Sequence, residues 1–86
     1  MKFLVIFQPK GAVPSDITER NKKIVEQAIK DDKILEMYYV PGWNKHVSIE
    51  EHDNAEAMLE QLQDNYIYGD VEIYPLVDYK ASRFMK

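Results

Sequence analysis

The sequence predicts an α+β domain whose elements follow the order β-α-β-β-α-β, with two helices on one face of a four-stranded antiparallel sheet. Strand-like runs of apolar and β-branched residues lie at 2–8, 34–40, 45–52 and 71–79. Stretches with helical apolar spacing lie between them, at 16–31 and 53–65. The chain has 86 residues and contains no repeat or linker, so residues 1–86 are expected to form a single domain.

The first strand and the first helix each carry a pattern that predicts their place in the fold. The strand is apolar on both alternating sides, which is typical of a central strand covered on both faces. Asp16 and Glu19 fit a capping box at the start of the helix. Asn21 falls within the apolar stripe of this helix. It is expected either to bond to backbone or a buried water, or to line a pocket beneath the helix.

In the second half of the chain, particular residues mark where strands turn and where the second helix begins. Pro41 and Gly42 indicate a turn between the second and third strands. Residues 53–56 form a second capping box, and residues 67–70 are expected to be a loop. Pro75 interrupts the hydrogen-bonding pattern of the last strand, which predicts an edge position or a bulge. In the tail, Phe84 and Met85 are expected to be buried against another surface.

The helices can cover only one face of the predicted sheet. The other face carries apolar side chains from the first and last strands, and their exposure would favour aggregation. Packing two such sheets face to face removes this exposure. A two-fold homodimer is therefore the expected assembly.

Composition excludes several classes of function. No cysteine is present, so a disulfide, a thiolate nucleophile or a cysteine-bound zinc is impossible. The net charge is -4, and basic residues do not cluster, which argues against nucleic-acid binding. The apolar run at residues 3–7 is too short for a membrane span or a signal-peptide core. A cytoplasmic protein that does not bind membranes is expected.

The third strand carries the residues best suited to chemistry. Alternation along a strand places His46, Ser48, Glu50 and His52 on one face. This face is either an exposed polar surface or the lining of a pocket that transfers protons, since imidazole exchanges protons near neutral pH. A metal site is not expected, because His46, Glu50 and His52 would spread over about 20 Å of strand.

Aromatic residues surround the predicted turn. Tyr38 and Tyr39 precede it, and Trp43 and Asn44 lead into the third strand. Trp43 is either a packing anchor or part of a flat apolar surface for a ring-shaped ligand. The chain has no glycine-rich phosphate loop, nucleophile elbow or nicotinamide or flavin pattern, so no cofactor is expected.

Three segments, at residues 40–50, 53–58 and 70–76, resemble the muconolactone isomerase family of the dimeric α+β barrel superfamily. The matching features are Gly42 before the third strand, Ser48 near its middle, the step Glu56-Ala57-Met58, and Pro75-Leu76. The resemblance implies a ferredoxin-like fold, a dimer or larger assembly, and a pocket between helices and sheet. It also implies proton-transfer or ring-forming chemistry without a cofactor. Residues 65–67 replace the family's Leu-Pro-Leu step, which leaves the substrate open.

The leading hypothesis is a cofactor-independent isomerase or cyclase that acts on a small lactone, aromatic or polyketide-like ring by proton transfer. His46 is the predicted proton-transfer residue, with Glu50 or Tyr38 as its orienting partner. The predicted substrate-binding residues are Asn21, Tyr39, Trp43, Asn44, Ser48 and His52, of which Asn21 would bond to a carbonyl or enolate oxygen.

Two other hypotheses remain open. Trp43 and Asn44 are residue types that cofactor-free monooxygenases of the same superfamily use. The chain would then oxidise an electron-rich phenolic substrate. A non-catalytic ligand-binding or assembly module of the same fold is the third possibility, because fold alone does not determine function.

Overall fold

The computed structural model describes residues 1–81 and confirms the α+β class with a four-stranded antiparallel sheet. The residues Phe84 and Met85 lie outside the described residues. The helices and strands, in chain order, are β1 (Lys2–Pro9), α1 (Ser15–Lys30), β2 (Ile34–Val40), β3 (Lys45–Glu51), α2 (Ala55–Gln61), α3 (Gln63–Tyr68), β4 (Gly69–Leu76) and a short 3-10 turn, η1 (Tyr79–Ala81).

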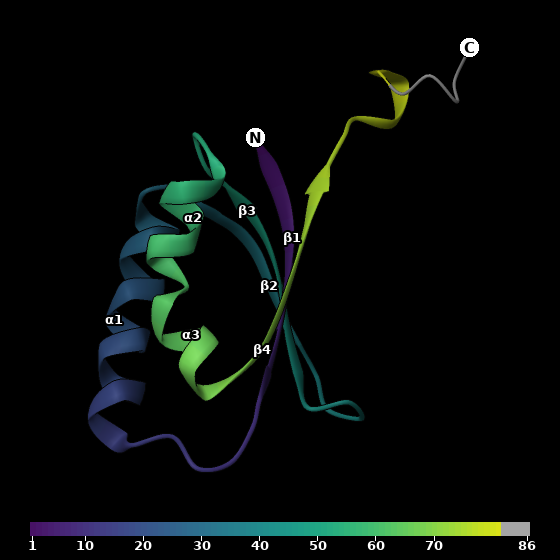
Figure 1. The fold of residues 1–86 in the computed structure, drawn as a ribbon. Helices are drawn as coiled ribbons and strands as arrows, with labels where there is room; N and C mark the ends of the chain where they lie inside the picture. The colour runs from purple at the N-terminus through teal and green to yellow at the C-terminus, as the bar shows by residue number, and fades with distance from the viewer. Residues whose placement is uncertain (82–86) are drawn as a thin grey trace.

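The sheet has the strand order β2-β3-β1-β4, and every neighbouring pair is antiparallel. The apolar strand β1 therefore lies inside the sheet, between β3 and β4, as its sequence predicts (Figure 1). Pro75 lies opposite Phe3 on β4, which is an edge strand. The missing N–H of proline is tolerated at an edge, so the predicted edge position is confirmed.

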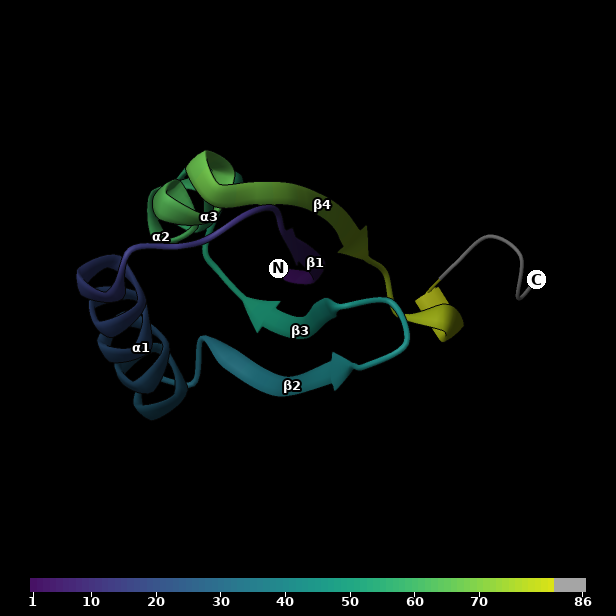
Figure 2. The same cartoon turned by 90° about the horizontal axis from the view of Figure 1, so that it is seen from below.

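The helices α1, α2 and α3 lie on the same side of the sheet, and no α-helix of residues 1–81 covers the opposite side (Figures 1 and 2). The buried core joins the helix-facing side of β1 to α2: Phe3 and Val5 pack with Met58 and Leu62. Val71 and Ile73 of β4 close this cluster from one side. The first helix contributes the buried residue Ala28. None of the helices in the described part of the chain has the length and apolar character needed to cross a membrane.

The start of α1 differs from the prediction. The helix begins at Ser15, its N-cap is Pro14, and no side chain bonds to the cap. The predicted capping box of Asp16 and Glu19 is therefore wrong, because Asp16 already lies within the first helical turn. Its carboxylate is instead placed where a negative charge favours the positive end of the helix dipole.

The second helical region is longer than predicted and is divided at Leu62, which caps both α2 and α3. Asn54 is the N-cap of α2, and its Oδ1 accepts a hydrogen bond of 2.9 Å from the backbone N–H of Ala57. The cap therefore lies one residue later than the predicted Asp53-to-Glu56 box.

The loop predicted at residues 67–70 is also wrong, because helix α3 runs to Tyr68 and β4 begins directly at Gly69. A Cβ atom at Gly69 would lie 2.3 Å from the carbonyl oxygen of Gln8 and 2.5 Å from the Phe7 ring. The absent side chain lets β4 pair closely with β1 at the point where the helix ends.

The opposite face of the sheet is apolar at its centre and carries tyrosines at its edges, beside the carboxylates of Glu36 and Glu72. Leu4, Ile6, Val47 and Ile49 occupy the two central strands and are partly exposed. Tyr38 on β2 and Tyr74 on β4 are more than two-fifths exposed, at 58% and 48%. We refer to these six residues as the open face.

Candidate functional site

A cavity of about 120 Å³ lies between the helices and the sheet. Its walls are mostly apolar, and its polar groups come from α1, α2, α3 and β3. The apolar lining residues are Val5, Phe7, Ile24, Val25, Ile34, Met37 and Leu62. The polar lining residues are Asn21, His46, Ser48, Glu50, Gln61 and Asn65. An apolar cavity with a few convergent polar groups is the usual form of a small-molecule site.

A second hollow of about 240 Å³ opens toward the start of α1 and the end of α3. The two hollows share Phe7, Asn21, His46 and Asn65. His46 and the two asparagine amides therefore lie where the inner cavity meets the outer hollow. The hypothesis that Asn21 lines a pocket beneath α1 is thus supported by its position.

Alternation along β3 brings the predicted residues to one face of the sheet. His46, Ser48 and Glu50 pair with Phe7, Val5 and Phe3 of β1, which face the helices. All three line the inner cavity. Ser48 and Glu50 are buried, whereas His46 is exposed at the end near the turn. The strand thus leads from an open mouth at His46 to a closed interior at Glu50.

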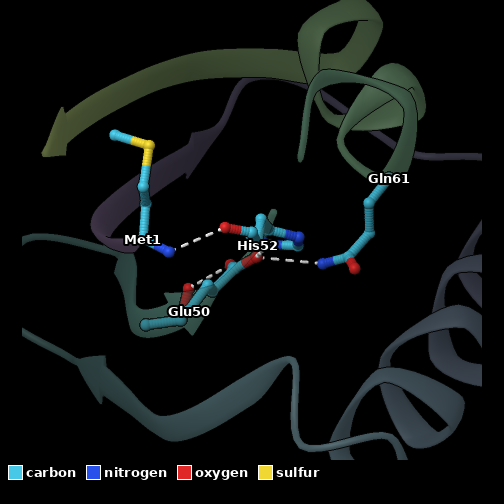
Figure 3. Close-up of polar contacts among 5 residues, drawn as sticks. Met1, Glu50, His52 and Gln61 are labelled. Carbon is cyan, nitrogen blue, oxygen red and sulfur yellow. Dashed lines mark hydrogen bonds and ion pairs between the residues drawn. The ribbon is translucent and has the colours of Figure 1, made fainter. Parts of the chain in front are cut away.

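Glu50 is the centre of a buried hydrogen-bond network and is only 2% exposed. Its Oε2 accepts a 2.6 Å bond from the Ser48 hydroxyl, and its Oε1 accepts a 2.9 Å bond from the Gln61 amide. His52 Nε2 lies 2.9 Å from the same Oε1, where the tautomer protonated at Nε2 donates. Figure 3 shows Gln61 of α2 and His52, which follows the end of β3, close to the Glu50 carboxylate.

The backbone of His52 is fixed by the start of the chain. Its N–H donates to the Met1 carbonyl over 3.0 Å, and its carbonyl accepts from the Met1 amino group over 2.9 Å (Figure 3). The side chain of His52 therefore approaches Glu50 from a position held by β-type pairing. The imidazole of His52 bonds to Glu50 and does not line the inner cavity. His52 therefore holds Glu50 in position, although the sequence predicted that it binds substrate.

Aromatic rings flank the imidazole of His46 on both neighbouring strands. The Tyr39 and Phe7 rings lie with centroids 4.9 Å and 6.1 Å from the imidazole, on β2 and β1 respectively. Tyr39, a predicted substrate-binding residue, therefore lies beside His46, but it lines neither hollow. Glu50 bonds to Ser48, His52 and Gln61, so the structure does not bring its carboxylate to His46 as an orienting partner.

Tyr38 is not brought to His46 either. It pairs with Val47 and so belongs to the open face, on the other side of the sheet. Its hydroxyl donates a 3.0 Å bond to Glu36, and this bond, with the negative charge of Glu36, raises the pKa of Tyr38. A bond to Glu72 raises the pKa of Tyr74 in the same way on β4. Both hydroxyls are therefore held more firmly in their protonated form.

Trp43 and Asn44 lie in the turn between β2 and β3, away from both hollows. Trp43 is 69% exposed, and the ammonium of Lys45 lies 5.6 Å from the centre of its ring. Asn44 has a φ of 51°, and its Oδ1 accepts a 2.8 Å bond from the Tyr39 hydroxyl. Asparagine tolerates this left-handed conformation better than most residues, which explains its place in the turn.

Two cavity residues, Gln61 and Asn65, were missed in the sequence. Both lie in the predicted helix at residues 53–65, where the apolar spacing does not include them. Gln61 ends α2, and the division of the helix at Leu62 gives α3 a new direction that points Asn65 into both hollows. No pattern in the sequence marks that division.

An ion pair lies beside the outer hollow. Arg20 of α1 donates to both carboxylate oxygens of Asp64 of α3, over 2.9 Å and 2.8 Å. This bidentate bond raises the pKa of Arg20. It joins α1 directly to α3.

No model of a known protein family matches the chain, and no curated protein matches it. Within residues 1–81, no three His, Asp or Glu side chains are grouped so that they would hold a metal ion. The site is thus described by its own geometry: an exposed imidazole and two amides at the mouth of an apolar cavity, with a buried carboxylate at its inner end.

Proposed function

We propose that this chain is a cofactor-independent isomerase or cyclase that moves a proton on a small ring-containing metabolite, such as a lactone. The observation that carries the proposal is the position of His46, whose imidazole lies at the junction of the two hollows beside Asn21 and Asn65. The resemblance of residues 40–50, 53–58 and 70–76 to the muconolactone isomerase family supports the reaction type.

In the proposed reaction, His46 removes a proton from the carbon next to a ring carbonyl. The electron pair moves onto the carbonyl oxygen, and the amide N–H groups of Asn21 and Asn65 stabilise the resulting enolate. Returning the proton at a different ring carbon shifts the double bond and leaves the overall composition unchanged. The apolar walls strengthen these hydrogen bonds because they exclude water from the reacting centre.

In this proposal Glu50 binds the substrate and does not orient His46, which was the role that the sequence predicted. Its carboxylate accepts bonds from Ser48, His52 and Gln61 at the closed end of the cavity. It therefore acts as a fixed polar group that contacts the far end of the substrate. Asn65 of α3 joins the predicted Asn21 of α1 as a substrate-binding residue, and Tyr38, Trp43 and Asn44 have no part in the proposed site.

We also propose that the working form is a homodimer in which two open faces pack together. The open face offers a continuous apolar centre with an aromatic rim, and the helices of its own chain leave it uncovered. This arrangement would leave the cavity of each subunit on the outer, helix-covered side. Each subunit would then hold a complete site.

The proton-transfer step is tested by following a β,γ-unsaturated γ-lactone in D₂O by NMR. The wild-type chain should speed the migration of the double bond and introduce deuterium at the carbon that accepts the proton. His46→Ala should lower this rate by a factor of about 10² or more, because general-base catalysis is lost. Lys45→Ala, at the adjacent position on the opposite side of β3, is the control and should leave the rate unchanged.

Equal rates for the wild-type chain and His46→Ala would remove His46 from the mechanism. A wild-type rate no greater than that of buffer, across a panel of such lactones and cyclic enones, would reject the isomerase. It would favour a non-catalytic binding module.

A further inference from the structure

The inner end of the cavity has an unused hydrogen-bond acceptor. A carboxylate offers about four acceptor positions on its two oxygens. In Glu50, Oε1 accepts from His52 and Gln61, whereas Oε2 accepts from Ser48 alone. Glu50, Ser48 and Gln61 all line the inner cavity, so this group is available to a molecule inside it. A hydrogen-bond donor on such a molecule could bond to Oε2 and would occupy the fourth acceptor position of the carboxylate.

The charge of the lining disfavours an anionic ligand. Among the residues that line the two hollows, all within the described part of the chain, none is lysine or arginine. Asp64, which lines the outer hollow, is paired with Arg20 through a bidentate bond. A ligand carboxylate would therefore meet the Glu50 carboxylate in a poorly hydrated space, where repulsion between like charges is strong.

The size of the cavity limits the ligand to about one ring. An engineered apolar cavity of about 150 Å³ accepts benzene in another protein, and the inner cavity here measures about 120 Å³. Val5, Ile24 and Met37 are among the side chains that form its apolar walls. His46 and Glu50 are four residues apart on β3, which separates their α-carbons by about 13 Å. A single functional group therefore does not reach both ends, and the ligand needs two polar groups on opposite sides of a ring.

We propose that the cavity selects an uncharged ring compound with a hydroxyl group that donates to Glu50 Oε2, and that it rejects carboxylates. The contact of the hydroxyl group with Glu50 does not depend on the proposed function. Only the other end of the ligand does, because the proposed reaction places the ring carbonyl beside His46, Asn21 and Asn65. The class of substrate is thus a hydroxylated cyclic ketone or lactone without an acid group. Glu50 is the residue that determines this specificity.

The test compares three single-ring probes: phenol, anisole, which lacks the donor, and benzoate, which carries the negative charge. Each is titrated into the ¹⁵N-labelled full chain, and the amide signals of Gln61 and Asn65 are followed. Phenol should bind at least about tenfold more tightly than anisole or benzoate, because its hydroxyl bonds to a charged acceptor. Glu50→Gln should weaken phenol binding by about tenfold and reduce the discrimination against benzoate.

Glu51→Gln is the matched control, since it removes the same charge from the neighbouring position, where the side chain is exposed. It should leave the order of the three probes unchanged. Benzoate or anisole binding as tightly as phenol to the wild-type chain would overturn the proposal, and this comparison needs no variant to fold. Because the readout is equilibrium binding, it is independent of whether the chain catalyses double-bond migration.

Discussion

At the scale of single residues, Glu50 shows how a small domain keeps a charge inside. Removing a carboxylate from water is costly unless its oxygens are hydrogen-bonded. The chain supplies donors from three places: Ser48 on the same strand, His52 just after it, and Gln61 on α2. The contact with Gln61 ties the helix layer to the sheet through a polar bond next to the apolar core.

The contribution of Gln61 is measurable. Gln61→Leu removes the amide and leaves Glu50 Oε1 with one donor fewer, so the free energy of unfolding should fall by about 1–3 kcal/mol. Gln63→Leu, two residues later on an exposed position, should change it by less than about 0.5 kcal/mol. Urea unfolding of both variants at pH 7 measures the difference. Equal effects would mean that the bond to Glu50 adds nothing to stability.

At the scale of elements, the junction between α3 and β4 is the tightest connection in the fold. The helix ends at Tyr68 and the strand begins at Gly69, so no loop residue is available to absorb a clash. Gly69 pairs with Pro9 at the end of β1, and Phe7, which lines the cavity, lies beside it. A disturbance at this junction therefore reaches the wall of the site.

Gly69→Ala should destabilise the fold by about 1–3 kcal/mol, because the added methyl group meets backbone atoms of Gln8 that cannot move without shifting β1. Gly42→Ala is the matched control, since no atom lies within 4 Å of the Cβ that alanine would add in the turn. Thermal unfolding of the two variants measures the contrast. A loss of stability at Gly42 as large as that at Gly69 would contradict the close-approach explanation.

At the scale of the whole molecule, the fold leaves one face of the sheet to be covered. Ile49 lies near the centre of the open face, opposite Leu4 on the neighbouring strand. In the proposed dimer, Ile49→Lys would bury an unpaired ammonium group in an apolar interface and should convert the dimer to a monomer. Leu59→Lys, which adds the same charge at an exposed position on α2, should leave the mass unchanged.

Light scattering coupled to size-exclusion chromatography, at matched protein concentrations, measures both variants against the wild-type chain. A wild-type chain that elutes with the mass of one subunit would reject the dimer. A dimer that persists in Ile49→Lys would place the interface elsewhere.

The sequence predicts the fold better than it predicts the site, and the reason is physical. Alternation and helical spacing are local, so they correctly place β1 inside the sheet, Pro75 on an edge strand, and His46, Ser48 and Glu50 on one face. The partners of these residues depend on packing between distant segments. Gln61 reaches Glu50 across 11 positions, and Asn65 reaches the cavity only because the helix divides at Leu62.

The turn that carries Trp43 has a practical consequence for spectroscopy. Trp43 is the single tryptophan of the chain, and its indole is largely in water at the tip of the β2–β3 hairpin, outside both hollows. Its fluorescence should therefore resemble that of indole in solution and should change little when a ligand occupies the cavity. Emission can report contacts made by the hairpin tip, but the filling of the cavity has to be followed by a probe on α1, α3 or β3.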